Sequence, residues 1–163
     1  MKKLCLLFFI ALFTMCHTTK KTISTSPDSK EASLLYTEQY RDDFKKVSDT
    51  QKSNFLKKIN ATAANYSVII FTNKYQGEEF SVSNEKGSLF NNQLISNMSS
   101  GVANKVRIEN TLDTKIIDRY KKQEFIIEAE KAKEYKFIYI MKDYTNSASP
   151  YKITYSNSLR PLI

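Results

Sequence analysis

The chain contains little cysteine, glycine, proline or histidine, and it contains no tryptophan. There are two cysteines, three glycines, three prolines and one histidine among the 163 residues. Phosphate-binding glycine loops, Cys-x-x-Cys redox motifs, EF-hand loops and His-Glu-x-x-His zinc motifs all need such residues in clusters, and the sequence has none of these patterns. We therefore expect no cofactor and no bound metal.

The scarcity of histidine also limits catalysis. The single histidine, His17, stands beside Cys16 near the amino terminus, so neither a Ser-His nor a Cys-His pair can be assembled within the folded domain. Asp42-Asp43 and Glu78-Glu79 are adjacent acidic pairs, and neighbouring side chains on a helix or strand point in different directions. We predict no catalytic residues and expect that the chain is not an enzyme.

The longest apolar run lies at the amino terminus. Met1-Lys2-Lys3 precede ten consecutive apolar residues, Leu4 to Phe13. A helix from Leu4 to Met15 would be about 18 Å long, well short of a hydrocarbon core of about 30 Å. A short apolar run behind lysines is typical of an export signal. We expect residues 1–15 to be this signal.

The end of the signal resembles the lipobox of bacterial lipoproteins. The residues are Phe13-Thr14-Met15-Cys16, and in that family the cysteine is acylated and becomes the first residue of the mature chain. The family usually has Leu three positions before the cysteine and a small residue directly before it, where this chain has Phe13 and Met15. The resemblance implies a lipid anchor at Cys16, and an ordinary secretory signal is the alternative. Cys5 would leave with the signal, so Cys16 would have no disulfide partner.

The residues behind the cysteine bear on destination in the lipoprotein family. An acidic residue there favours inner-membrane retention, and an acidic cluster favours surface display in Bacteroidota. This chain has His17 followed by Thr18-Thr19-Lys20-Lys21. The resemblance therefore implies an outer-membrane, lipid-anchored protein that faces the periplasm. The abundance of Lys, Asn, Ile and Tyr is similar to that of proteins from Bacteroidota.

Two segments separate the anchor from the rest of the chain. Residues 16–27 are rich in Thr, Ser and Lys and end in Pro27, which predicts a flexible tether. Residues 28–61 predict an amphipathic helical segment, either one bent helix or two short ones, because Ser48 to Gln51 interrupts it with a capping pattern. Its large apolar side chains recur at helical spacing: Tyr36, Tyr40, Phe44, Val47, Phe55, Leu56 and Ile59.

From Tyr66 onward the hydrophobic period becomes that of strands. Short apolar or alternating runs, separated by Lys, Asn, Ser and Pro, predict seven strands, or eight if residues 89–95 form one. We expect residues 66–163 to form an antiparallel β-sandwich or barrel, so that the fold is mainly β. Its predicted core includes Ile70, Phe80, Val106, Ile108, Ile127, Phe137 and Ile153.

One stretch resembles a βγ-crystallin Greek-key motif. It runs from Phe71 through Tyr75 and Gly77 to Phe80, with a strand near Val106, and the resemblance covers residues 68–109. The spacing between the aromatic residues is one residue shorter than in the family, and the calcium motif is missing. We carry over no calcium site. We interpret Phe71 to Phe80 as a hairpin in which Gly77 supplies a positive φ.

Charge argues against a nucleic-acid partner. The net charge is +8, but the basic residues are scattered as pairs along the chain, whereas nucleic-acid binders gather them on one face. Partners are therefore expected to be the membrane, through the lipid anchor, and another protein or a ligand.

Two functions remain. The first is a structural or assembly component that tethers another envelope protein, through a face of Tyr36, Tyr40 and Phe44 or a strand with Tyr151 and Tyr155. A small sandwich on a lipid tether is similar in layout to the outer-membrane lipoprotein of type VI secretion complexes. The second is a small-ligand or carbohydrate-binding module that uses its tyrosines for stacking. The aromatic face could instead pack on the domain's own sheet.

Overall fold

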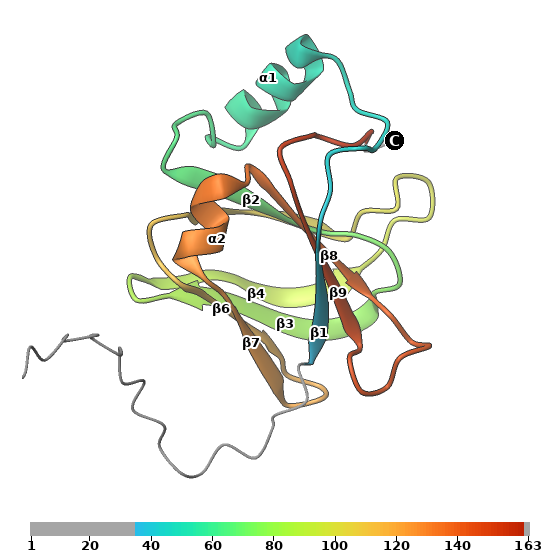
Figure 1. Cartoon of the computed structure of the whole chain (residues 1–163). Helices are drawn as coiled ribbons and strands as arrows, with labels where there is room; N and C mark the ends of the chain where they lie inside the picture. Colours follow the sequence, from blue (N-terminus) through green and yellow to red (C-terminus); the bar gives the residue numbers. More distant parts are fainter. Residues whose placement is uncertain (1–34, 162–163) are drawn as a thin grey trace, which may run out of the picture. The chain divides into compact units, whose positions relative to one another are not determined.

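The computed structural model describes residues 35–161, which form two β-sheets that face each other (Figure 1). The first sheet has the strand order β1-β9-β8-β2-β5, and the second has the order β4-β3-β6-β7. The prediction of a mainly β fold is confirmed, and of the two predicted forms, sandwich or barrel, the structure is sandwich-like. The strands of the described residues are β1 (Tyr36–Tyr40), β2 (Tyr66–Phe71), β3 (Gln76–Asn84), β4 (Gly87–Ile95), β5 (Asn104–Glu109), β6 (Thr114–Asp118), β7 (Gln123–Ile127), β8 (Phe137–Lys142) and β9 (Tyr151–Ser156).

Pairing within the first sheet is mixed. The second sheet is antiparallel throughout, but β1 runs parallel to β9 and β2 runs parallel to β8. Helix α2 (Ala129–Glu134), which the sequence did not predict, follows β7 of one sheet and precedes β8 of the other. The chain thus passes from the second sheet to the first through α2, and β8 then lies parallel to β2.

The interpretation of Phe71 to Phe80 as a hairpin is wrong. Phe71 ends β2 in the first sheet, while Phe80 lies in β3 of the second sheet, so the residues between them cross from one layer to the other. The predicted positive φ of Gly77 is confirmed at 112°. It occurs where the register of β3 against β4 shifts, between Gln76 and Glu78, as expected of a bulge.

The predicted helical segment has a different structure in its first described part. Residues 28–34 lie outside the described residues. Tyr36–Tyr40 form an edge strand that pairs with β9, so the prediction of a helix there is wrong. The cause is the spacing: residues four apart share a face in a helix and also in a strand.

Helix α1 (Asp49–Lys58) occupies the second part of that segment. Ser48 is its N-cap, and Ser48 and Gln51 make the reciprocal hydrogen bonds of a capping box. No helix within residues 35–161 has the length and apolar character needed to cross a membrane.

Apolar side chains cover both faces of the first sheet. The inner face, with Ile138 and Ile153, packs against Phe80 and Ile127 of the second sheet. The outer face forms a second cluster, in which residues of the central strands contact side chains of α1 and of its C-cap: Val68, Ile70, Phe137, Phe55, Leu56 and Ile59. All seven predicted core residues are buried, although Ile70 and Phe137 belong to the outer cluster.

Adjacent isoleucines of β7 give a matched test of the sandwich. Ile127 is fully buried between the sheets, whereas Ile126 is 44% exposed on the other face of the same strand. We expect Ile127→Ala to lower the free energy of unfolding by about 2–5 kcal/mol, because it leaves a cavity in the core. Ile126→Ala should cost less than about 1 kcal/mol in the same urea titration. Equal losses would contradict the assigned register.

Candidate ligand-binding cleft

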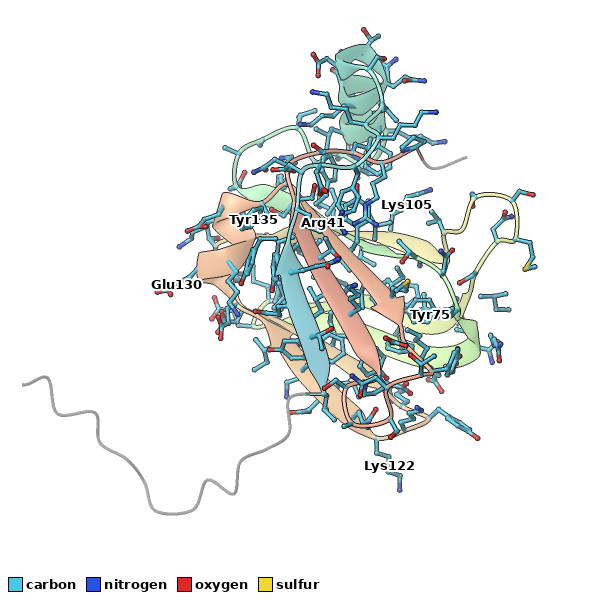
Figure 2. All side chains as sticks on the ribbon, turned by 45° about the vertical axis from the view of Figure 1, so that its right-hand side comes forward. Arg41, Tyr75, Lys105, Lys122, Glu130 and Tyr135 are labelled. Atoms are coloured by element: carbon cyan, nitrogen blue, oxygen red, sulfur yellow. The ribbon has the colours of Figure 1, made fainter. Side chains whose placement is uncertain are left out.

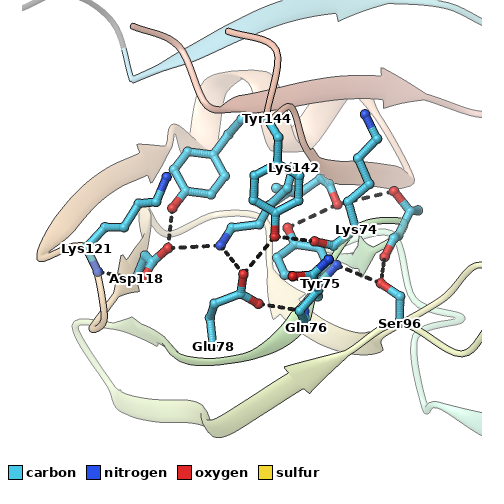
Figure 3. A network of polar contacts seen from close by, with 12 residues as sticks. Lys74, Tyr75, Gln76, Glu78, Ser96, Asp118, Lys121, Lys142 and Tyr144 are labelled. Atoms are coloured by element: carbon cyan, nitrogen blue, oxygen red, sulfur yellow. Dashed lines mark hydrogen bonds and ion pairs between the residues drawn. The ribbon is translucent and has the colours of Figure 1, made fainter. Parts of the chain in front are cut away.

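A buried ionic cluster joins the two sheets at one end of the core (Figure 3). Lys142 of β8 is 1% exposed, and its Nζ lies 2.6 Å from Glu78 Oε1 of β3 and 3.5 Å from Asp118 Oδ2 of β6. The hydroxyl of Tyr151 donates to Asp118 Oδ2 at 2.5 Å, and that of Tyr144 donates to Glu78 Oε1 at 2.9 Å. Each buried charge therefore has partners of opposite charge or strong dipoles.

Contacts within the cluster shift the pKa values of Glu78 and Tyr151. Burial opposes the ionisation of Glu78, but hydrogen bonds from Lys142, the backbone N–H of Gln76 and Tyr144 outweigh it and lower the pKa of Glu78 to about 2. Burial and the hydrogen bond to Asp118 raise the pKa of Tyr151 far above its ordinary value. Because its members satisfy one another, we interpret the cluster as a bridge between the sheets.

Removing the charge of Lys142 tests whether the cluster stabilises the fold. We expect Lys142→Met to lower the free energy of unfolding by about 3–5 kcal/mol, because it leaves the buried Asp118 without its cation. The control is Lys115→Met, since Lys115 is largely exposed and pairs with Glu124 at 3.5 Å on the surface. That change should cost no more than about 0.5 kcal/mol. Urea denaturation measures both, and a small loss for Lys142→Met would refute the bridge.

A cleft of about 320 Å³ lies on the outer face of the five-stranded sheet. Its floor contains Gln39 of β1, Thr154 of β9 and Tyr139 of β8, which are register partners in a row across three strands. Gln39 Nε2 donates to Thr154 Oγ1 at 2.7 Å. Figure 2 shows these strands from the side of this face, with Arg41 where β1 ends.

The walls of the cleft come from four segments. They are the loop between β1 and α1, the loop between β4 and β5, the segment after β9 and the loop between β2 and β3, which contribute Phe44, Gly101, Arg160 and Asn73. Gly101 has a φ of 63°, and a Cβ there would come within 2.5 Å of Asn73 Oδ1. Glycine at this position therefore lets the two loop segments approach closely.

Asp42 links the loop after β1 to the chain around the end of β9 through hydrogen bonds. Its Oδ1 accepts hydrogen bonds from Ser156 Oγ at 2.7 Å, Asn157 N at 2.6 Å and Ser158 N at 2.9 Å. Burial opposes the ionisation of Asp42, but these bonds outweigh it and lower the pKa of its carboxyl group. The loop after β1 and the segment after β9 therefore hold each other in place.

Arg160 lies between two aromatic rings at the cleft. Its Cζ is 3.5 Å from the ring centroid of Phe44 and 4.1 Å from that of Tyr139. The Tyr139 hydroxyl accepts the backbone N–H of Arg160 at 2.9 Å and donates to Ser158 O at 2.9 Å. Nε and Nη2 of Arg160 are buried and have no hydrogen-bond partner among the described residues. The rings thus hold the side chain in place, while two of its nitrogens lack hydrogen-bond acceptors.

The cleft is positively charged. Arg41, Lys152 and Arg160 line it, and none of the described residues that line it carries a carboxylate. Arg41 already has a partner, because its Nε and Nη2 each donate to an oxygen of Asp43 at 2.8 Å. Burial lowers the pKa of Arg160 and Arg41 acts in the same direction, while Tyr139 and Asp43 act against them. An arginine nonetheless stays charged at any ordinary pH. The site is therefore complementary to an anion.

The residues predicted to bind a partner lie in different environments. Tyr151 and Tyr155 are fully buried, so the expectation that their strand presents them to a partner is corrected. Their hydroxyl groups donate hydrogen bonds within the domain, that of Tyr155 to Glu38 Oε1 at 3.3 Å and that of Tyr151 to Asp118 Oδ2. Tyr36 is half-buried and packs on Phe125, with ring centroids 5.5 Å apart.

Two of the predicted residues keep accessible surface. Tyr40 is 49% exposed, although its ring stacks on Tyr155 at 5.3 Å between centroids. Phe44 lines the cleft and contacts Arg160. Cys16 lies outside the described residues. The basic residues of the cleft were missed, because Arg41, Lys152 and Arg160 come from segments that only strand pairing brings together.

Comparisons with known proteins add no functional information. No protein-family model matches the chain, and no curated protein matches it significantly. Within residues 35–161, no group of three or more His, Cys, Asp or Glu side chains is arranged to hold a metal ion. Functional inference therefore depends on the geometry of the cleft.

Proposed function

We propose that this chain is a lipid-anchored binding module of the bacterial envelope without enzymatic activity, and that the cleft is its ligand-binding site. The observation that carries the proposal is Arg160, which has two buried N–H donors without an acceptor among the described residues. A buried unsatisfied donor costs about 1–3 kcal/mol, and more when the group is charged. A ligand that supplies acceptors would recover this free energy.

The cleft also has the features of a preformed site. Small-molecule sites are concave and combine apolar walls with a few convergent polar groups. Here Phe44 and Tyr139 supply the apolar surfaces, while Gln39 and Thr154 supply polar groups on a rigid sheet. The bonds of Asp42 fix the walls, so little conformational entropy is lost when a ligand binds.

A charge reversal tests the site. We expect Lys152→Glu to weaken a bound small ligand by at least about tenfold, because it places a carboxylate in the positive cleft. The ligand would come from a thermal-shift screen of anionic and neutral metabolites against the full chain purified in detergent. Lys115→Glu makes the same charge change on the other sheet and should leave affinity unchanged. Equal effects of both changes, or no hit in the screen, would refute the proposed site.

The anchor belongs to the same proposal. Its support is the sequence pattern that ends at Cys16, followed by the tether at 16–27, and it implies attachment to the outer membrane on the periplasmic side. We expect the mature chain to begin at Cys16 and to carry acyl chains, which intact-mass measurement would detect. Cys16→Ala should move the protein from the membrane fraction to the soluble fraction. An unmodified wild-type mass with unchanged partitioning of the variant would contradict the anchor.

A second candidate is the assembly component that tethers another envelope protein, such as a subunit of a secretion-type membrane complex. The exposed ring surface of Tyr40 favours it, because a large aromatic side chain at a sheet edge is suited to protein contacts. The burial of Tyr151 and Tyr155 leaves this candidate with a smaller surface than the sequence implied. The ligand-binding module is therefore the better supported function.

A further inference from the structure

We infer that the cleft recognises a planar carboxylate group, held side-on by the Nε and Nη2 edge of Arg160 between the rings of Phe44 and Tyr139. This assignment rests on the proposed function and adds the chemical class of the ligand. Four observations support it: the identity of the unsatisfied atoms, a matching contact elsewhere in the chain, the shape of the slot and the charge of its surroundings.

The first observation is which atoms of Arg160 lack partners. Nε and Nη2 are the buried nitrogens without a hydrogen bond among the described residues. On a guanidinium these two atoms share one edge, and their N–H bonds on that edge point the same way. The spacing of that pair matches the two oxygens of a carboxylate, which allows two parallel charge-assisted hydrogen bonds.

The second observation is that Arg41 makes this contact within the same chain. Its Nε donates to Asp43 Oδ1 at 2.8 Å and its Nη2 donates to Asp43 Oδ2 at 2.8 Å. The Cζ of Arg41 lies 4.6 Å from the ring centroid of Phe44, whose ring also contacts Arg160. Both arginines therefore contact the ring of Phe44, and Asp43 accepts two hydrogen bonds from Arg41. A carboxylate from a ligand could accept the same two hydrogen bonds from Nε and Nη2 of Arg160.

The third observation is the shape of the slot. The ring centroids of Phe44 and Tyr139 lie 3.5 Å and 4.1 Å from Arg160 Cζ, so both rings pack closely against the flat cation. A planar carboxylate can lie in the plane of the guanidinium, whereas a tetrahedral phosphate places oxygens above and below that plane. Nε and Nη2 are covered from solvent, so the ligand reaches them when a covering side chain rotates aside, while the backbone of the walls stays where the bonds of Asp42 hold it.

The fourth observation is the character of the surrounding surface. Lys152 adds a second cation, and the amide and hydroxyl side chains of Gln39, Thr154 and Ser100 line the rest of the cleft. These groups suit a ligand that carries hydroxyl groups beside its carboxylate. A sugar acid has this chemistry, so D-glucuronate is a suitable probe, with D-glucose as its neutral counterpart.

The test uses the full chain purified in detergent with ¹⁵N-labelled arginine. We expect D-glucuronate to shift the Nε–H resonance of Arg160 in a saturable titration, while D-glucose leaves it unchanged. Inorganic phosphate should bind at least about tenfold more weakly than D-glucuronate, because its oxygens do not all lie in the plane of the guanidinium. The Arg160→Lys protein assigns the resonance, since it is the one that this variant lacks.

Two variants distinguish the effect of the paired guanidinium donors from the effect of the positive charge. Arg160→Lys keeps the positive charge but loses the paired donors, and it should weaken D-glucuronate by at least about tenfold. Arg107→Lys is the matched control, because Arg107 also stacks on a ring, that of Tyr66 at 4.6 Å, and lies outside the cleft. It should leave the affinity unchanged. If Arg160→Lys fails to fold, the relative affinities of D-glucuronate, D-glucose and phosphate for the natural chain, measured by calorimetry, still decide the question.

Several results would overturn the inference. They are phosphate or D-glucose binding as tightly as D-glucuronate, no shift of the Arg160 resonance, or full affinity in the Arg160→Lys protein. A neutral ligand that is lost in Lys152→Glu would overturn the carboxylate assignment and leave the proposed function standing. Failure of every ligand to bind in the cleft would end both.

Discussion

The central strands of the five-stranded sheet are apolar on both faces, and the rest of the domain is arranged to cover them. The second sheet covers the inner face, which leaves Val68, Ile70 and Phe137 on the outer face without a matching sheet. Helix α1 has ten residues, so at about 1.5 Å per residue it spans only about 15 Å of that face. The loop after β1 and the segment after β9 cover the neighbouring part, and the cleft forms where they meet.

The buried cations of Lys142 and Arg160 have different surroundings. Lys142 lies between carboxylates contributed by the opposite sheet, so its charge is neutralised where it is buried. Arg160 is covered by aromatic rings, which favour a cation but accept no conventional hydrogen bond from the Nε and Nη2 edge. The first arrangement is complete within the chain and suits a structural role. The second has no acceptor among residues 35–161, and completion by an acceptor from elsewhere is the property expected of a recognition site.

Much of the sandwich could be predicted from hydrophobic period, because strands from Tyr66 onward alternate or run apolar in a way that helices do not. Strand β1 could not be predicted in this way, because a charged residue, Glu38, occupies the inward position between Tyr36 and Tyr40. Its carboxylate is stabilised there by Lys131 at 2.7 Å, a partner that is remote in sequence. Parallel pairing and α2 also left no local signal. Of the cleft, only Phe44 was singled out, because arginines on loops resemble any solvated charge until the sheet brings them together.

The parallel pairing of β1 with β9 has a mechanical consequence. If the chain is anchored at Cys16 as proposed, a pull from the membrane enters the described domain at the start of β1. The hydrogen bonds of β1 to β9 lie across the strand axis, from the pair Tyr36 and Tyr151 to the pair Tyr40 and Tyr155. A pull along β1 loads these bonds together in shear, whereas a peeling force would break them one after another. If the chain is lipid-anchored as proposed, the edge strand is thus oriented as a strain-bearing attachment between lipid and domain.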